Sequence, residues 1–298
     1  MKKIAKKVIK IIFNKLGFNI IKTRNHESVV IKDYKYTPKH RISSENSKIV
    51  ETIENWYKYN HEEIIKLHNN IYSLKNNFFK IPINATSDIL PHWSNDFISP
   101  FDAISIYGFL ALYNPRYYVE VGSGNTTLFA AQSIRDNNLR TKIISIDPFP
   151  RAEIDKICSE IFRLPLEDME LDFFSRLSSE DILLIDNSHR SFPNSDVTVF
   201  FTEILPNLPS GILYTLHDIF LPSDYPEQWS SIEKRWYNEQ YLLCAYLLGG
   251  GNGDKIICPN YFLSGKEEIF EIYKSLWSKK DFLIDLGFGG GFFWMKKN

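Results

Sequence analysis

The sequence predicts an α/β protein, with a Rossmann-like, seven-stranded, mostly parallel sheet that has helices on both faces and an N-terminal helical extension before it. From residue 117 onward, short apolar stretches alternate with helical stretches, which is the rhythm of successive βαβ units. A glycine-rich turn, "YVEVGSGNTT" at 118–127, follows the first apolar stretch. A strand–turn–helix junction of this kind is where such sheets bind nucleotide-like ligands.

The individual elements follow from hydrophobic spacing and from turn residues. Strands are expected at 117–121, 142–147, 182–186, 211–216, 255–260 and 291–297, with a weaker one at 160–164 and with the last strand antiparallel. Helices are expected at 43–80, 99–112, 126–138, 193–205, 229–248 and 266–279. The glycine runs at 249–251 and 289–291 are interpreted as loops.

Three segments are expected along the chain: a basic amphipathic helix at 1–24, a helical extension and linker at 25–95, and the sheet-containing domain at 96–298. The three cysteines are far apart and form no CxxC pair, which predicts neither a disulfide framework nor a zinc site and favours a reducing cytoplasm. No apolar run approaches the roughly 18 residues of a transmembrane helix.

The first segment is strongly basic. Residues 1–24 contain seven lysines and Arg24 but no acidic residue, so the remainder of this chain of net charge −1 is acidic overall. Apolar residues and lysines occupy opposite arcs of the helical wheel, which suits either an anionic membrane surface or a helix packed on the domain. Because the rest of the surface is acidic, nucleic-acid binding is not expected.

Glu120 is unusual because it is a carboxylate inside an apolar strand, two positions before the glycine turn. A nicotinamide dinucleotide site of the G-x-G-x-x-G type would have glycine where this chain has Thr127, and a carboxylate at the strand end would repel a pyrophosphate. S-adenosylmethionine has no phosphate and carries an ammonium and a sulfonium group. Glu120 therefore favours S-adenosylmethionine as the cofactor.

Asp147 ends the second apolar stretch, "IISIDPFPR", 23 residues after Gly124. An acidic residue at this spacing reaches ribose hydroxyls from the tip of the neighbouring strand. An Asp in a turn before proline is also common for structural reasons alone. In combination with Glu120 and the glycines, the ligand-binding interpretation is favoured.

With these residues the sequence resembles the class I S-adenosylmethionine-dependent methyltransferases over residues 96–298. Glu120, Gly122 and Gly124 match the first motif of that family, and Thr126 stands where a third glycine is usual. The resemblance implies that Asp147 holds the ribose and that Glu167 or Asp168 meets the adenine amino group. It also implies cofactor contacts along the turn, namely at Glu120, Gly122, Ser123, Gly124, Asn125 and Thr126.

Polar residues follow the fourth and fifth strands as well. "DILLIDNSHR" brings Asp186 and His189 to one strand tip, and "GILYTLHDIF" brings His217 and Asp218 to the next. These side chains are predicted to form the reaction centre, with Asp186, His189 and His217 as its catalytic residues and one of the two histidines as the base. Asp186, His217 and Asp218 could instead hold a divalent ion, and such oxygen-rich ligands favour Mg²⁺ or Mn²⁺.

This layout resembles the bacterial methyltransferases of surface-glycan and glycosylated natural-product pathways, some of which are metal-dependent sugar O-methyltransferases. The stretches "DNSHR", "HDIFLPSDYP" and "WYNEQYLL" resemble the glycan branch, although His217-Asp218 replaces a pair of acids. The resemblance implies a sugar or glycan acceptor, nucleotide-linked or lipid-linked. Tyr225, Trp229 and Glu239 would line its binding site.

The sequence thus predicts a cytoplasmic O-methyltransferase acting on a sugar hydroxyl, and residues 1–24 could place it on the inner face of the membrane. One alternative is a methyltransferase-like binding module that scaffolds a glycan-assembly complex without turnover. A nicotinamide-dependent oxidoreductase is a second alternative, and Glu120 and Thr127 argue against it.

Overall fold

The structure is a computed structural model that describes residues 39–42, 47–278, 283 and 286–298. Its contacts divide the chain into two units, Met1–Pro38 and Lys39–Asn298, and the second unit is the one described below. The basic helix predicted at 1–24 and the linker up to residue 38 lie outside the described residues. No helix in the described ranges is long and apolar enough to cross a membrane.

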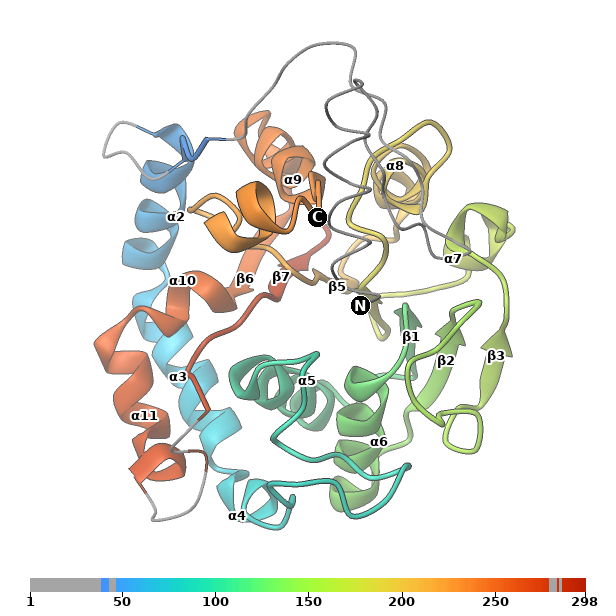
Figure 1. Cartoon of the computed structure of the whole chain (residues 1–298), viewed down its shortest axis with the longest axis vertical. Coiled ribbons are helices and arrows are strands. Elements are labelled where there is room, and N and C mark those ends of the chain that lie inside the picture. The colour runs from blue at the N-terminus through green and yellow to red at the C-terminus, as the bar shows by residue number, and fades with distance from the viewer. Residues whose placement is uncertain (1–38, 43–46, 279–282, 284–285) are drawn as a thin grey trace, which may run out of the picture. The chain divides into compact units, whose positions relative to one another are not determined.

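Seven strands form one sheet in the order β3-β2-β1-β4-β5-β7-β6 (Figure 1). The strands are β1 (Tyr117–Val121), β2 (Lys142–Ile146), β3 (Glu160–Phe162), β4 (Ile182–Ile185), β5 (Leu213–Leu216), β6 (Lys255–Pro259) and β7 (Phe293–Lys296). Strands β1 to β5 pair in parallel, whereas β7 is antiparallel to both of its neighbours. This arrangement confirms the predicted fold class, including the antiparallel last strand.

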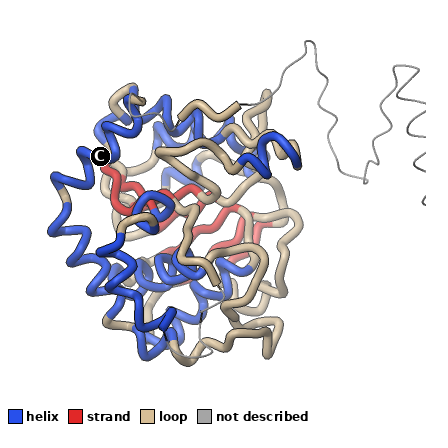
Figure 2. Tube along the Cα trace, turned by 60° about the vertical axis from the view of Figure 1, so that its left-hand side comes forward, coloured by secondary structure: helices blue, strands red, loops and turns tan. Residues whose placement is uncertain are grey.

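Helices cover both faces of the sheet, and the strands form a central layer between them (Figure 2). On one face lie α5 (Pro100–Tyr113) and α6 (Asn125–Asn137), and on the other lie α8 (Asp196–Val199) and α9 (Glu239–Leu248) (Figure 1). The remaining helices are α2 (Lys48–Tyr59), α3 (His61–Tyr72), α4 (Lys75–Phe78), α7 (Asp172–Ser175), α10 (Asn260–Ser264) and α11 (Glu267–Ser278).

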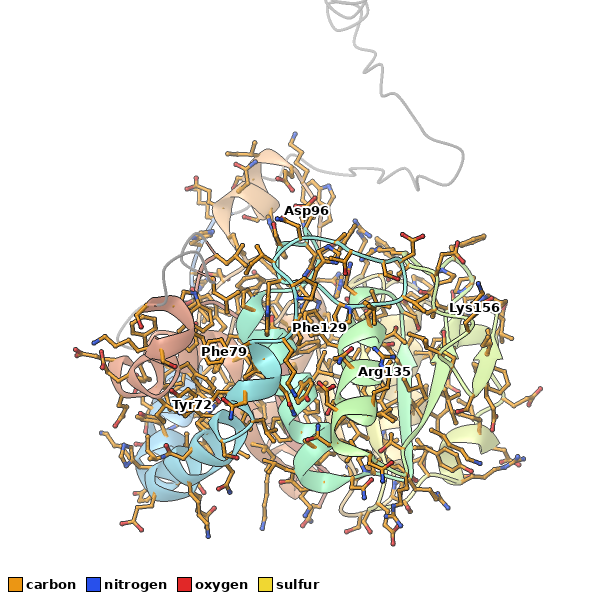
Figure 3. The ribbon with its side chains drawn as sticks, turned by 90° about the horizontal axis from the view of Figure 1, so that it is seen from below. Tyr72, Phe79, Asp96, Phe129, Arg135 and Lys156 are labelled. Atoms are coloured by element: carbon orange, nitrogen blue, oxygen red, sulfur yellow. The ribbon has the colours of Figure 1, made fainter. Side chains whose placement is uncertain are left out.

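Helix α5 is the most buried helix of the described chain, because it lies between the sheet and the outer helices. Eleven of its residues are buried, and it begins where the Ser99 side chain accepts a hydrogen bond from the backbone of Asp102. It ends at Asn114, which adopts a left-handed conformation. Figure 3 shows this side of the molecule from below, with Phe129 of α6, Tyr72 of α3 and Phe79, directly after α4, labelled.

Two predicted helices differ from the structure. The region 43–80 forms three helices, α2 to α4, rather than one. The helix predicted at 229–248 is divided into a short π-helix, Gln228–Ile232, and the α-helix α9 from Glu239 onward. The backbone N–H groups of Asn238 and Glu239 bond to the carbonyl of His189 at 2.9 and 3.4 Å, which ties this segment to the loop after β4 instead of to a preceding helical turn.

The central strands end in register at their carboxyl ends. Val121 of β1 pairs with Ile146 of β2 and with Ile185 of β4, and Ile185 pairs in turn with Leu216 of β5. The residues that follow these four positions are Gly122, Asp147, Asp186 and His217. The register therefore brings four of the predicted site residues to one edge of the sheet.

Candidate functional site

The glycine turn joins β1 to α6 at this edge. Gly122 has a positive φ of 78°, and a Cβ atom placed on it would lie 1.7 Å from the backbone oxygen of Asp186. Only glycine therefore allows the turn to pass this close to the end of β4. Inside the turn, the Gly124 N–H donates to the Thr127 hydroxyl at 3.0 Å.

Glu120 lies beneath the turn and is fully buried. Its carboxylate accepts hydrogen bonds from the hydroxyls of Tyr118 and Thr127. These bonds explain how an acidic side chain is accommodated in an apolar strand. Burial raises the pKa of Glu120 to about 8, although the hydroxyls of Thr126, Thr127 and Tyr118 act to lower it. In this structure Glu120 braces the turn through Thr127.

Asp147 follows β2 next to the turn. Its two carboxylate oxygens accept the backbone N–H groups of Ser123 and Phe149, each at 2.7 Å. Each oxygen keeps a further lone pair, so the carboxylate can still accept from hydroxyl groups of a ligand. Glu167 lies farther along the chain in a short turn, half-buried, and burial raises its pKa.

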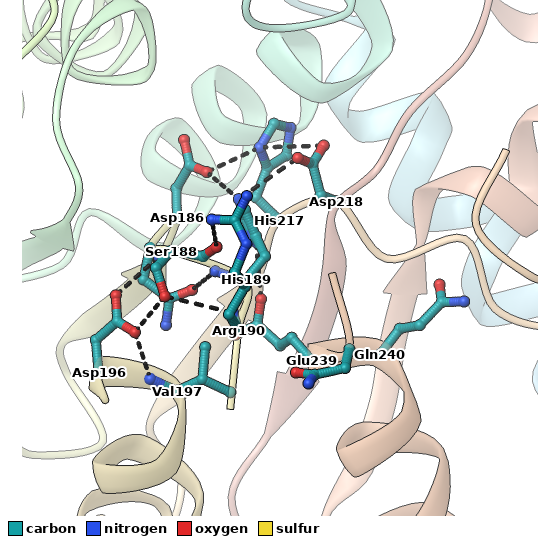
Figure 4. A network of polar contacts seen from close by, with 12 residues as sticks. Asp186, Ser188, His189, Arg190, Asp196, Val197, His217, Asp218, Glu239 and Gln240 are labelled. Atoms are coloured by element: carbon teal, nitrogen blue, oxygen red, sulfur yellow. Dashed lines mark hydrogen bonds and ion pairs between the residues drawn. The ribbon is translucent and has the colours of Figure 1, made fainter. Parts of the chain in front are cut away.

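A second group of polar side chains, the histidine–carboxylate cluster, forms beyond β4 and β5 (Figure 4). We define it as Asp102, Asp186, His189, His217, Asp218 and Glu239. The structure therefore brings together all four side chains predicted at the two strand tips. It adds Glu239 from the start of α9 and Asp102 from the first turn of α5.

His189 is held between carboxylates on both sides of its ring. Its Nδ1 lies 2.9 Å from an oxygen of Glu239, and its Nε2 lies 3.3 Å from Asp186 and 3.4 Å from Asp218. Burial acts to lower the pKa of His189, but the contacts with Asp186, Glu239 and Asp218 raise it well above 6.5. The ring is almost fully buried and packs against Tyr237 at 4.6 Å.

His217 has a similar arrangement. Its Nδ1 is 3.2 Å from Asp186 and 3.8 Å from Asp218, and its Nε2 is 3.6 Å from Asp102. Burial acts to lower the pKa of His217, and the neighbouring carboxylates raise it well above the usual value. Four carboxylates thus surround two imidazoles, so the cluster keeps an excess of negative charge even when both rings are protonated.

Asp102 was missed by the sequence reasoning, because "SPFD" at the start of a helix is typical of an ordinary helix cap. Its carboxylate accepts from Asn260, from Ser99 and from the backbone N–H groups of Gly291 and Phe292, at 2.7 to 3.0 Å. These bonds fix the segment before β7 beside the site, where Phe292 packs on the ring of His217 at 4.5 Å.

Two cluster residues have backbone conformations that are uncommon for residues other than glycine. His189 has φ of 59° and Asp218 has φ of 55°. Such conformations persist only where surrounding contacts enforce them, and they concentrate at functional sites. Both occur directly at the edge where the glycine turn ends.

The comparisons with known proteins bear on this same part of the chain. Residues 119–219 match the family model of a methyltransferase domain. The match runs from β1 to the end of β5 and includes the glycine turn and four of the six cluster residues. The sheet order and this match agree, so the fold is a Rossmann-like methyltransferase fold and the chain is a methyltransferase.

Solved structures give weaker similarities. The plantazolicin methyltransferase BpumL bound to SAH is 13% identical, covers 85% of this chain and 100% of its own, and has a TM-score of 0.41. The Podospora anserina methyltransferase PaMTH1 is 12% identical over 86% of this chain and 99% of its own, with a TM-score of 0.41. An O-methyltransferase from Bacillus cereus is 11% identical over 82% and 98%, with a TM-score of 0.37. The comparison with curated proteins gives no match.

The methyltransferase domain has features that suit the expected S-adenosylmethionine. Gly122 lets the backbone approach closely, and Asp147 has free lone pairs at the tip of β2. In addition, the amide nitrogen of Asn187, directly after Asp186, is buried without a hydrogen-bond partner among the described residues. A buried donor of this kind at a ligand edge fits a bound group with acceptor oxygens. Ser123 and Thr126 are themselves buried, and Ser123 bonds to Ser145 rather than facing outward.

The predicted metal ligands of this methyltransferase contact one another directly. Asp186 and Asp218 lie 3.2 and 3.8 Å from the Nδ1 atom of His217. Over the described ranges, no set of three or more His, Cys, Asp or Glu side chains is arranged as a metal site. In its chemistry the donor set of two carboxylates and an imidazole suits a divalent ion, so the metal stays a prediction.

The three residues predicted to line the acceptor site lie near one another but differ in exposure. Tyr225 is 3% exposed, and its hydroxyl accepts the backbone N–H of Gln240 at 3.1 Å. Glu239 is fully buried against His189, so it belongs to the cluster. Trp229 is half-buried and lies under the guanidinium of Arg235 at 3.9 Å.

Proposed function

We propose that this methyltransferase transfers the methyl group of S-adenosylmethionine to a hydroxyl of a sugar acceptor in surface-glycan biosynthesis. The observation that carries the proposal is the position of the histidine–carboxylate cluster, because Asp186 both touches the glycine turn and contacts the two histidines. A proton acceptor for a hydroxyl thus lies beside the expected cofactor turn. The ring of Tyr237 packs on His189 and the ring of Trp229 packs on Tyr237, which supports a sugar as the acceptor, since sugars stack on aromatic faces.

The chemistry assigned to the chain is positioning and proton removal. S-adenosylmethionine supplies a methyl group on a positively charged sulfur. His189 takes the proton of the acceptor hydroxyl at Nε2, while Glu239 holds the opposite nitrogen at 2.9 Å and so fixes the orientation of the ring. With the proton held by His189, the hydroxyl oxygen would accept the methyl group that the bound cofactor supplies, and the electron pair of the carbon–sulfur bond would stay on sulfur.

His189 must be neutral before it can act as a base. Its pKa is raised by the surrounding carboxylates, and it falls when another positive charge enters the cluster. Asp186 and Asp218 lie 3.3 and 3.4 Å from His189 Nε2, so they stabilise the ring once that nitrogen has taken the proton. If a divalent ion is held by Asp186, His217 and Asp218, it would lower the pKa of a bound acceptor hydroxyl.

The test uses the full chain. Calorimetry with S-adenosylhomocysteine and with NADH comes first, and binding of the former alone is expected. Transfer of a labelled methyl group to nucleotide-linked and lipid-linked sugars then separates an enzyme from a scaffold that binds without turnover. Binding of NADH without S-adenosylhomocysteine, or cofactor binding without transfer to any sugar, would contradict the proposal. Adding a chelator or Mn²⁺ to the transfer assay tests the ion.

We also propose that the protein acts in the cytoplasm and that residues 1–24 attach it to the anionic inner face of the membrane. Seven lysines without an acidic residue support this, since each contributes about 1 kcal/mol near such a surface. Co-sedimentation with vesicles containing phosphatidylserine should be strong for the full chain and weak for a chain starting at Asn25. Equal, salt-insensitive partitioning of the two would contradict it.

A further inference from the structure

The side-chain amide of Asn187 has a hydrogen-bond partner for its oxygen but none among the described residues for its nitrogen. Its Oδ1 accepts the backbone N–H of His189 at 3.0 Å, which fixes the orientation of the amide and leaves the NH₂ group pointing elsewhere. That nitrogen is buried and has no hydrogen-bond partner within the described part of the chain. A buried donor left unpaired is unfavourable. A structural role in the turn therefore explains why the oxygen is bonded, but it does not explain why the nitrogen is buried without a partner.

The surroundings of Asn187 indicate what the missing partner is. Asn187 follows Asp186, whose carbonyl oxygen the turn approaches at Gly122, and a Cβ atom on Gly122 would lie 3.7 Å from the backbone nitrogen of Asn187. The residue is therefore at the junction between the glycine turn and the cluster. The ligand part that reaches this junction must be close to the transferred methyl group, whereas the ribose is expected at Asp147 across β1.

The charges at the junction bear on which part of the cofactor contacts Asn187. The cluster beside Asn187 contains four carboxylates and two histidines, and Glu120 lies under the turn. At this junction the amide nitrogen of Asn187 is a buried neutral donor, and the hydrogen bond to its oxygen already fixes its orientation. Of the groups attached to the sulfur of S-adenosylmethionine, the amino-acid part carries the strongest acceptor, its carboxylate.

We propose that the Asn187 amide nitrogen donates a hydrogen bond to the carboxylate of the cofactor's amino-acid part. The inference rests on the proposed function, because it requires S-adenosylmethionine at the turn. It makes Asn187 a binding residue, separate from the acid–base chemistry of the histidines.

The substitution Asn187→Asp isolates the donor, because aspartate keeps the oxygen that accepts from His189 and replaces the NH₂ group by an acceptor. Calorimetry with S-adenosylhomocysteine should show affinity reduced about tenfold or more. Asn194→Asp is the matched control, since it adds the same charge to the same loop at an exposed residue, and its affinity should stay within about twofold.

A second ligand places the contact on the cofactor. Decarboxylated S-adenosylhomocysteine keeps the amine and the adenosine but lacks the carboxylate. The wild-type protein should bind it more weakly than S-adenosylhomocysteine, whereas Asn187→Asp should bind the two equally or prefer the decarboxylated form, as in a double-mutant cycle. Unchanged binding of the decarboxylated ligand also shows that the variant is folded.

The outcomes separate this inference from the proposed function. If wild-type protein fails to bind S-adenosylhomocysteine, the proposed function is wrong and the inference falls with it. If wild type binds but Asn187→Asp has no effect, or weakens both ligands by the same factor, the proposed function stands and the assignment of Asn187 to the carboxylate is overturned.

Discussion

The glycine turn and the histidine–carboxylate cluster meet at the same edge of the sheet but are constructed in opposite ways. The turn uses ten consecutive residues, and its one carboxylate, Glu120, is bonded to hydroxyls at most seven positions away. The cluster draws its six side chains from α5, the ends of β4 and β5, and α9. The turn therefore depends on space for the backbone, whereas the cluster depends on a balance of charges. Substitutions in the two regions should separate binding from turnover.

The largest effect is expected from Gly122→Val. A Cβ atom there would lie 1.7 Å from the Asp186 carbonyl, and valine does not tolerate the φ of 78°. We expect no detectable binding of S-adenosylhomocysteine and a melting temperature lower by roughly 10 °C. The control is Gly287→Val, where a Cβ atom would meet nothing within 4 Å. Retention of normal ligand binding in Gly122→Val would mean that the turn is not the cofactor site.

Substitutions in the cluster should reduce turnover but leave cofactor binding intact, and Asp186→Ala tests this most directly. One oxygen of Asp186 lies 3.2 Å from His217 and 3.3 Å from His189, so its removal changes both histidines at once. We expect turnover to fall by about 100-fold or more, with the affinity for S-adenosylhomocysteine within a few fold of wild type. Asp172→Ala, at an exposed position of α7, is the control. Near-normal turnover in both Asp186→Ala and His217→Ala would place the reaction elsewhere.

The same contrast explains what could be predicted from sequence. The order of apolar stretches and the glycine spacing are local signals, so the sheet, the turn and the polar strand tips follow from them. Asp102 gave no such signal, because it joins the cluster through packing of α5 against the segment before β7, 189 residues later in the chain. The helix expected at 229–248 is interrupted before Glu239 for a related reason: Asn238 bonds to the His189 carbonyl across the fold, and this contact outweighs local helical preference.

A smaller effect is expected from Glu239→Gln. The variant can still accept a hydrogen bond from His189 Nδ1, but it loses the negative charge that holds the ring. We expect kcat to fall about tenfold to 100-fold, KM to change little, and Glu239→Asp to recover part of the loss. Glu271→Gln, an exposed carboxylate paired with Lys274 on α11, should behave as wild type. A change in KM alone would instead assign Glu239 to acceptor binding.

The smallest expected effect is on stability, and it comes from Glu120→Gln. This variant tests whether Glu120 is protonated in the folded turn. Burial raises its pKa to about 8 from an ordinary value of 4.5, so between these two values the folded protein holds a proton that the unfolded chain releases. The free energy of unfolding contributed by Glu120 must then decrease as the pH rises from about 4.5 to about 8, and stay constant above that range. Glu120→Gln has no such group. We would measure the melting temperatures of both proteins at pH 5, 6.5 and 8.5. Relative to the wild type, the melting temperature of Glu120→Gln should rise by a few degrees from the lowest to the highest pH. A difference that does not depend on pH would show that Glu120 does not titrate in this window. A shift toward the wild type with rising pH would contradict the raised pKa of Glu120.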